Sequence, residues 1–415
     1  MERNKRKFTS DKTTNRIERS SERISQFKQP ASTGTVILRK QLFDKSFIPS
    51  DAISILEEFD SIVQSVRPLN SRQLQQLPGN IKEFSHQLTD ERSTRRLGYM
   101  NESIQLSVYT RYYLWWNLVR QTRLFANLDS DCFPENDCIC LDVGSGPLTV
   151  VTALWLSRPE LREKKLTWYV MDVSQNSLKV GEDIFLAVAA KTKCEPWKII
   201  RVKGSFGTHV NQKAAFITCA NAMNEMEQTS DMPPEYKAKK LYETLKNYSE
   251  KDAKYLMIEP GVPKSSRLLC LFRERFLKDG FNIKSPCTHS GECPMNGFKA
   301  FTGSQNKLCN FAFSTENAPR KLLKLSDMAK LPQDRAVLSF MSAVPQNTNS
   351  VSEEYLKLRI ASDGFKLPFH RKGFYACSEL GLILISVLED SRITSGALLE
   401  LTLNVKVEEL PVDEK

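Results

Sequence analysis

Short apolar runs alternate with helix-compatible stretches between residues 138 and 262, and this alternation constrains the fold more than any other feature of the chain. The apolar runs cover residues 138–143, 166–171, 198–203, 215–220 and 254–258. Strands that alternate with helices form βαβ units, whose strands pair in parallel through right-handed crossovers. The sequence therefore predicts an α/β protein built on a mainly parallel sheet.

The flanking regions differ from this segment in pattern. Residues 1–40 are basic, rich in Ser and Thr and poor in apolar side chains, which predicts a disordered arm that RNA could hold. Residues 41–130 follow a helical period and predict a helical region. We expect the α/β domain at 131–315, with a Cys-rich loop at 287–309. Residues 316–415 predict a small β-rich extension.

An aromatic stripe precedes the α/β segment. Tyr109, Tyr112, Tyr113 and Trp116 fall mostly at helical spacing. Such a stripe most simply predicts a helix packed into the core. The alternative is a lid over a neighbouring pocket.

The charge and cysteine content restrict partner and compartment. The 415-residue chain has a formal net charge of +10, which favours a polyanionic partner, nucleic acid first. Its apolar stretches, such as 380–388, are shorter than the roughly 18–20 residues that cross a bilayer. We therefore expect a soluble protein with no membrane partner. The cysteines are too dilute for a disulfide scaffold, and no apolar signal core follows the first residue, which predicts a reducing compartment.

A glycine loop follows the first apolar run. Asp142 ends this run and is followed by Gly144, Ser145 and Gly146, ahead of an expected helix. The glycines let the backbone turn sharply and approach a ligand, and the helix N-terminus favours a carboxylate or phosphate. Asp142 can accept hydrogen bonds from an amine. The pattern G-x-G-P departs from the dinucleotide fingerprint G-x-G-x-x-G and from a P-loop.

Polar residues also end the next strands. Asp172 ends the second strand, Ser205 follows the third and Asn221 follows the fourth. Open α/β sheets bind ligands at the carboxyl ends of their strands, where an acidic residue can accept hydrogen bonds from a ribose. This arrangement resembles the class I S-adenosylmethionine (SAM)-dependent methyltransferases, which have a Rossmann-like sheet.

That resemblance implies roles for these residues. Asp142, Gly144, Ser145 and Gly146 would meet the methionine part of SAM, and Asp172 would meet its ribose. Ser205 and Asn221 would lie near the adenine and the substrate.

The residues after the fourth strand are the polar candidates for catalysis. They are Asn221, Asn224 and Glu225, which could equally cap the following helix. The motif Asn/Asp-Pro-Pro-Tyr of amino-methylating enzymes is absent. No Pro-Cys pair follows the fourth or fifth strand as a covalent nucleophile would require.

Cysteines cluster after the α/β segment. Cys287, Cys293 and Cys309 lie close in sequence, and Cys377 follows. Their spacing differs from the paired C-x₂-C of zinc ribbons. Four thiolates complete either a zinc tetrahedron or a [4Fe–4S] cube, and His289 could replace one of them. The other cysteines predict buried packing, namely Cys132, Cys138, Cys140, Cys194, Cys219 and Cys270.

Several short segments of the sequence together resemble one family. They lie at 109–117, 141–147, 220–226, 258–263, 266–269, 286–289, 293–294 and 308–311. The series resembles the methyltransferase-like proteins associated with the small ribosomal subunit, found in mitochondria and in some bacteria. It covers roughly 100–315 and extends to Cys377. Leu148, where many active enzymes have a small residue, and Asn310, where His is frequent, depart from the pattern.

The resemblance implies a class I methyltransferase domain with a [4Fe–4S] cluster and a role in small-subunit assembly through rRNA. The implied cluster ligands are Cys287, Cys293, Cys309 and Cys377. The first three would lie between a sixth strand near 282–285 and a seventh near 309–313.

Three functions follow as hypotheses. The first is a SAM-dependent methyltransferase that acts on or with small-subunit rRNA, and the second is a non-catalytic iron–sulfur assembly factor that binds rRNA. The third is a protein or small-molecule methyltransferase with a structural zinc. We expect a monomer off the ribosome. Acidic residues in the arm are atypical of transit peptides, which favours the cytoplasm, with the mitochondrial matrix as the alternative.

Overall fold

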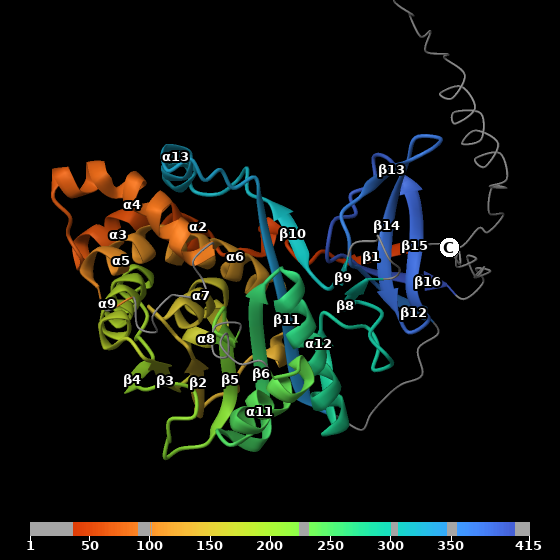
Figure 1. Cartoon of the computed structure of the whole chain (residues 1–415), viewed down its shortest axis with the longest axis horizontal. Helices are drawn as coiled ribbons and strands as arrows, with labels where there is room; N and C mark the ends of the chain where they lie inside the picture. The colour runs from red at the N-terminus through yellow and green to blue at the C-terminus, as the bar shows by residue number, and fades with distance from the viewer. Residues whose placement is uncertain are drawn as a thin grey trace, which may run out of the picture.

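The centre of the molecule is an eight-stranded mixed sheet (Figure 1). This computed structural model describes residues 36–89, 100, 102–223, 232–299, 306–346 and 355–402. The strand order is β10-β11-β6-β5-β2-β3-β4, and β7 also pairs with β11. The strands are β2 (Cys138–Val143), β3 (Leu166–Asp172), β4 (Lys198–Lys203), β5 (Ala214–Ala220), β6 (Ser249–Pro260), β7 (Phe281–Ser285), β10 (Phe311–Ser314) and β11 (Arg335–Pro345).

The five strands from β2 to β6 are parallel to one another, as the alternating pattern predicts. Strand β11 runs antiparallel beside β6. Helices cover both faces of the sheet: α7 (Thr149–Ser157), α8 (Pro159–Arg162), α9 (Gln175–Thr192), α11 (Pro234–Lys246) and α12 (Pro263–Lys278). A central parallel sheet buried on both faces explains why its strands read as continuous apolar runs. The expected α/β fold, a mainly parallel sheet between helices, is confirmed.

Each face of the sheet has its own aromatic core. On one face Trp155 of α7 packs edge-on against Trp197, with ring centroids 4.9 Å apart. On the other face Tyr255 of β6 packs against Phe276 of α12 at 4.6 Å. The helices are thus fixed on the sheet by large buried side chains, which stabilises the strand ends between them.

The helical region lies at one end of the sheet (Figure 1). It contains α2 (Ser50–Glu57), α3 (Phe59–Val66), α4 (Ser71–Thr89), α5 (Ser103–Val108), a π-helical turn (Tyr109–Tyr113) and α6 (Leu114–Ala126). Trp115 donates its indole N–H to the Leu56 carbonyl at 2.9 Å, and Trp116 donates to Ser326 Oγ of α13 (Arg320–Met328) at 3.1 Å. Helix α6 is therefore held inside the molecule. None of the described helices is long and apolar enough to span a membrane.

One edge of the sheet differs from the predicted arrangement. Strands β7 and β10 both pair with β11, through Ala343↔Ile283 and Leu338↔Phe311. The sixth and seventh strands of the sheet in chain order, predicted near 282–285 and 309–313, are β7 and β10. The eighth strand, β11, lies beyond residue 315, where the sequence ended the domain. The Cys-bearing segment leaves the sheet after β7 and returns to the same side of β11. The short hairpin β8 (Asn296–Lys299) and β9 (Asn306–Leu308) lies within it.

A second, antiparallel sheet lies at the opposite end of the molecule (Figure 1). Its order is β1-β16-β12-β14-β13, with β15 beside β14. The strands are β1 (Val36–Lys40), β12 (Tyr355–Ile360), β13 (Phe365–Leu367), β14 (Arg371–Ser378), β15 (Gly381–Leu388) and β16 (Leu398–Thr402).

This second sheet brings the two ends of the described chain together. Strand β1 pairs antiparallel with β16 through Val36↔Leu401. The sequence assigned 36–40 to the disordered arm, which is wrong for these five residues because their backbone groups complete the β16 edge. The rest of the predicted arm, 1–35, lies outside the described residues.

Candidate active site

The predicted glycine loop connects β2 to α7 through three left-handed residues. Gly144, Gly146 and Leu148 have φ values of 68°, 51° and 56°. Glycine adopts this region without strain, whereas a leucine there costs about 1–2 kcal/mol, which the full burial of Leu148 offsets. Helix α9 packs directly on the loop, because a Cβ on Gly181 would lie 2.4 Å from the Pro147 carbonyl carbon.

The loop opens on a cavity of about 710 Å³ at the carboxyl ends of the parallel strands. All six residues that the resemblance assigned to the cofactor line it, together with Asn221. They are Asp142, Gly144, Ser145, Gly146, Asp172 and Ser205. The structure therefore brings together residues that span more than 60 positions of sequence. A cavity of this size fits a nucleoside-type ligand.

Asp172 ties two of the cavity's loops together. Its Oδ2 accepts a hydrogen bond from the Gly146 N–H at 2.9 Å, and its Oδ1 accepts one from the Ser174 N–H at 2.8 Å. The Gly204 N–H, after β4, donates to the Asp172 carbonyl at 3.0 Å. The side chain therefore fixes the relative positions of the loops after β2 and β3.

Asp142 is a buried carboxylate with an unmatched oxygen. The residue is 1% exposed, and its Oδ1 accepts a hydrogen bond from Thr218 Oγ1 of β5 at 2.6 Å. Its Oδ2 has no hydrogen-bond partner among the described residues. Burial raises the pKa of Asp142 to about 7, and the negative charge of Asp172 acts in the same direction. A cationic amine in the cavity would satisfy the oxygen and favour the ionised form.

The helical region supplies the opposite wall. Tyr109, Tyr113 and Asn117 line the cavity at intervals of four residues, with Leu88 and Met100 beside them. Tyr112 and Trp116, by contrast, are buried in the core, so the aromatic stripe serves both of the roles considered from sequence. The π-helical turn lies within this stripe, as π-bulges often do at functional sites. Leu88 and Met100 fit no local motif, so their place at the cavity was not predictable from the sequence.

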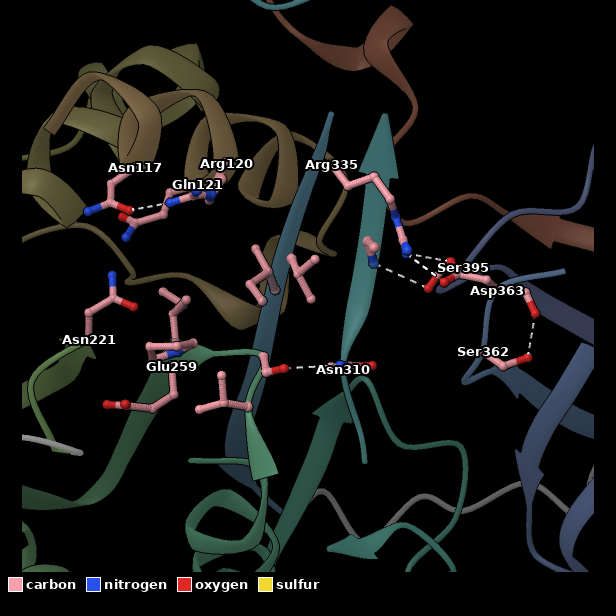
Figure 2. A pocket seen from close by; sticks show the side chains of 17 residues that line it. Asn117, Arg120, Gln121, Asn221, Glu259, Asn310, Arg335, Ser362, Asp363 and Ser395 are labelled. Atoms are coloured by element: carbon pink, nitrogen blue, oxygen red, sulfur yellow. Dashed lines mark hydrogen bonds and ion pairs between the residues drawn. The ribbon is translucent and has the colours of Figure 1, made fainter. Parts of the chain in front are cut away.

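A second cavity of about 540 Å³ adjoins the first (Figure 2). The two share Asn117, Asn221 and Pro260 as lining residues. Glu259, at the end of β6, is 1% exposed and accepts a hydrogen bond from the Met223 N–H at 3.0 Å. Glu259 lies in the stretch 258–263 that resembles the family, but the sequence did not predict that it would lie at this cavity.

Only one of the predicted catalytic residues can be placed. Asn221 has a left-handed φ of 57° and lies where the two cavities meet, with its N–H donating to the Ile258 carbonyl at 2.8 Å. Asn tolerates this conformation better than most residues, and such conformations recur at functional sites. Asn224 and Glu225 lie outside the described residues.

The four predicted cluster ligands converge at the junction of the two sheets. The pKa values of Cys309 and Cys377 are raised, chiefly by burial and then by the charges of Cys287 and Cys293, so the four thiols lie within electrostatic range. His289 Nε2 lies 3.3 Å from the Cys377 Sγ. Cys377 of β14 thus lies near the segment that carries the other three, and the cluster that the resemblance implies is taken up below as a proposal.

Two arginines and a fifth thiol accompany these cysteines. Arg273 Nε donates to Cys287 Sγ at 3.3 Å, and Arg359 Nε donates to the Pro286 carbonyl at 2.8 Å. A hydrogen bond with the Cys270 thiol lowers the pKa of Cys293 to about 6. Sequence reasoning classed Cys270 as packing. It is buried, but its thiol also belongs to this cluster, which its isolated position on α12 did not indicate.

The clustered thiols and His289 are not arranged around a single metal ion. In the described part of the chain, no group of three or more His, Cys, Asp or Glu side chains is close enough to hold one. A zinc tetrahedron needs four ligands on one ion. The arrangement of the thiols and His289 therefore does not fit zinc.

The chain is similar to several solved methyltransferase structures. A precorrin-6y C5,15-methyltransferase from Geobacter metallireducens is 8% identical, with a TM-score of 0.31 over 54% of this chain and 87% of that one. A SAM-dependent methyltransferase from Geobacter sulfurreducens, in complex with S-adenosyl-L-homocysteine, is 11% identical, with a TM-score of 0.30 over 55% and 90%. At such values the fold assignment rests on the strand order described above.

Comparison at the level of sequence is more specific. No curated protein matches the chain. Residues 113–361, more than half of the sequence, match one family. This span includes the glycine loop, the strand ends that line the two cavities, and three of the four clustered cysteines. The chain belongs to the family described as mitochondrial small ribosomal subunit Rsm22.

Proposed function

We propose that the chain binds SAM in the larger cavity and acts on or with the rRNA of the small ribosomal subunit during assembly or translation. The observation that carries this proposal is Asp142, a buried carboxylate with an unmatched oxygen that faces a cavity beside a glycine loop. The amino group of SAM is a cation that would pair with it.

The chain's own residues can bind and orient the ligand. Asp172 would accept hydrogen bonds from the ribose hydroxyls, and Ser205 would lie near the adenine. When bound, SAM supplies an already activated methyl group, so the protein need only hold an acceptor in line with it. Asn221, between the two cavities, is the residue that we propose for that positioning.

The ribosomal part of the proposal rests on the family. Its description names the mitochondrial small subunit, and the net charge of +10 suits a polyanionic RNA partner. We therefore propose association with the small subunit and prefer the mitochondrial matrix over the cytoplasm that the arm's acidic residues suggested. We propose a monomer off the ribosome.

A second candidate is the non-catalytic iron–sulfur assembly factor. In this proposal Cys287, Cys293, Cys309 and Cys377 hold a [4Fe–4S] cluster, whose thiolates attach to different iron atoms and need not surround one ion. The mutual electrostatic influence of the four thiols supports it, as does the nearby Arg273 and Arg359 charge, which would stabilise thiolates.

One set of measurements tests the cluster. Anaerobic purification should give brown protein that contains iron and acid-labile sulfide in equal amounts. Cys293→Ser should lower both and reduce thermal stability, since metal binding contributes to folding. Colourless protein without iron and sulfide would refute the cluster.

A binding and transfer experiment tests the principal proposal. Wild-type protein should bind S-adenosyl-L-homocysteine, and Asp142→Ala should weaken that binding at least tenfold, measured by calorimetry. Asp390→Ala, an exposed change in the described region, is the matched control. With small-subunit particles and methyl-labelled SAM, label should enter rRNA with wild type and not with Asp142→Ala. Failure of wild type to bind the ligand would refute SAM binding, whereas particle binding without label would favour the assembly factor.

A further inference from the structure

We propose that the second cavity holds a nucleobase of RNA turned out of its strand, with its edge read by carboxamide side chains. The inference rests on the proposed function, because the base would be the acceptor presented to the methyl donor. The lining comes from α6, the ends of β5 and β6, the adjacent parts of β10 and β11, and the loops of the second sheet (Figure 2).

The position of the cavity is the first argument. It shares Asn117, Asn221 and Pro260 with the larger cavity, here called the donor cavity because we propose that it binds SAM. Ligands in the two cavities would therefore contact the same three residues. Its volume of about 540 Å³ lies in the range of small-molecule sites, about 300–1,000 Å³. A group held here would be adjacent to whatever occupies the donor cavity.

The polar lining is the second argument. Four carboxamides reach the cavity from separate elements: Asn117, Gln121, Asn221 and Asn310. A carboxamide carries a donor and an acceptor side by side, the pattern that pairs with the edges of nucleobases. Asn117 keeps its amide N–H groups for a ligand, since its Oδ1 accepts from Arg120, and Asn310 keeps its Oδ1, since its Nδ2 donates to the Gly261 carbonyl. Gln121 is 2% exposed, and its Oε1 has no hydrogen-bond partner among the described residues. A base amine or imino N–H would satisfy this buried acceptor.

Arg120 adds a positive charge to the same wall. Its Nη1 donates to Asn117 Oδ1 at 3.0 Å and its Nη2 to Gln333 Oε1 at 3.4 Å, while its Nε has no partner in the described chain. Its hydrogen bonds therefore go to amides, and its guanidinium lies over the Trp116 ring at 6.0 Å. Arg335 across the cavity is instead paired with Asp363 at 2.6 Å. A guanidinium without a carboxylate suits a base carbonyl or a phosphate.

The acidic groups argue against a lysine or amine ligand. Asp363 is engaged by Arg335, and Glu259 accepts a backbone hydrogen bond, so neither is presented as a lone counter-ion. Apolar side chains form the remaining walls and could cover the faces of a flat ring. They are Ile258, Val262, Val337 and Leu338. Amide edges with apolar faces match a base better than a charged side chain.

The experiment uses the full chain saturated with S-adenosyl-L-homocysteine, which blocks the donor cavity. Each of the four nucleoside 5′-monophosphates is then titrated and followed by saturation-transfer NMR. At least one should bind, and Gln121→Leu should weaken its binding at least tenfold with the affinity for S-adenosyl-L-homocysteine unchanged. Val262→Trp, at a position that is 40% exposed, should block binding by bulk without disturbing the core.

Gln105→Leu is the matched control, because Gln105 Oε1 is also buried and has no hydrogen-bond partner in the described part of the chain, but Gln105 lines neither cavity. This variant should bind as wild type does. If wild type binds S-adenosyl-L-homocysteine but no nucleotide, or if Gln121→Leu and Val262→Trp both bind nucleotide normally, the inference is wrong while SAM binding stands. If S-adenosyl-L-homocysteine itself does not bind, the proposed function fails first.

Discussion

Asp142 shows how burial gives one residue a function that its type alone does not specify. Most aspartates are exposed and ionised at neutral pH, with a pKa near 3.8, but burial raises the pKa of this one to about 7. One of its oxygens accepts a hydrogen bond from Thr218, and the other has no hydrogen-bond partner among the residues that the structure describes. The side chain is therefore prepared for a cation and is unfavourable without one.

The first prediction concerns pH. A cationic ligand amine binds the ionised carboxylate, so the affinity for S-adenosyl-L-homocysteine should fall about tenfold per pH unit below 7 and level off above 7. Asp142→Asn should bind weakly and without this pH dependence. Calorimetry between pH 5.5 and 8.5 measures both, and a wild-type affinity that is flat across this range would contradict the prediction.

The same residue has a consequence for stability. Its pKa is higher in the folded protein than the ordinary 3.8, so the folded state binds the extra proton between about pH 4 and 7. The contribution of Asp142 to stability is therefore full below pH 4 and is lost as the pH rises toward 7. The difference in unfolding free energy between wild type and Asp142→Asn should change in that direction.

Residues at strand ends were predictable, and residues that meet through tertiary packing were not. Asp142, Asp172 and Ser205 follow apolar runs whose parallel pairing places their ends on one edge. Gln121 and Cys270, by contrast, lie on helices whose local pattern gives no information about what they face. Their neighbours are set by the docking of α6 and α12 on the sheet.

Among the elements, α9 and the glycine loop depend most directly on one another. The backbone of Pro147 lies where a side chain at position 181 would begin, so Gly181 permits the helix to pack at this distance. The left-handed residues on either side of Pro147 leave the loop little freedom to move away. The geometry of the donor cavity is therefore set partly from outside it.

The second prediction compares two helical glycines. Gly181→Ala should destabilise the protein by about 1–3 kcal/mol through overpacking against Pro147, and should weaken S-adenosyl-L-homocysteine binding. Gly79→Ala in α4 meets nothing within 4 Å, so improved helix propensity should stabilise it by up to about 1 kcal/mol. Urea unfolding measures both. Equal stability of the two variants would mean that α9 can shift without cost.

The positions of the strands along the chain were easier to predict than which strands pair with one another. The parallel strands fall where their apolar patterns indicate. Strand β11 was missed, although residues 336–344 form a largely apolar run typical of a buried strand. The predicted domain ended at β10, the seventh strand in chain order, and so left out the eighth. Pairing on both β7 and β10 depends on the length of β11, which local patterns do not reveal.

At the scale of the whole molecule, the first described strand completes the sheet formed by the last ones. Strand β1 extends β16, Arg39 pairs with Glu400 at 2.5 Å, and Lys40 pairs with Asp129 at 2.6 Å. Surface ion pairs contribute little individually, so the backbone pairing supplies most of this connection. The second sheet is therefore built from both ends of the sequence.

The third prediction uses two truncations. Removal of residues 1–35 leaves every described interaction in place and should not change the melting temperature. Removal of residues 1–40 also deletes β1 and exposes the β16 edge, which should lower the melting temperature by about 2–4 °C and increase proteolysis at β16. Identical melting curves for the two truncations would show that β1 contributes nothing to stability.

The return of the Cys-bearing segment to the side of β11 from which it departed has a further consequence. Because β7 and β10 occupy successive portions of a single neighbouring strand, the intervening residues close a loop whose two ends are both anchored. Such a loop can lengthen or shorten over generations at little cost to the sheet. The segment between β7 and β10 can thus change in length without rearrangement of the strands that hold its ends, whereas Cys377, on β14, is held by the second sheet independently of that segment.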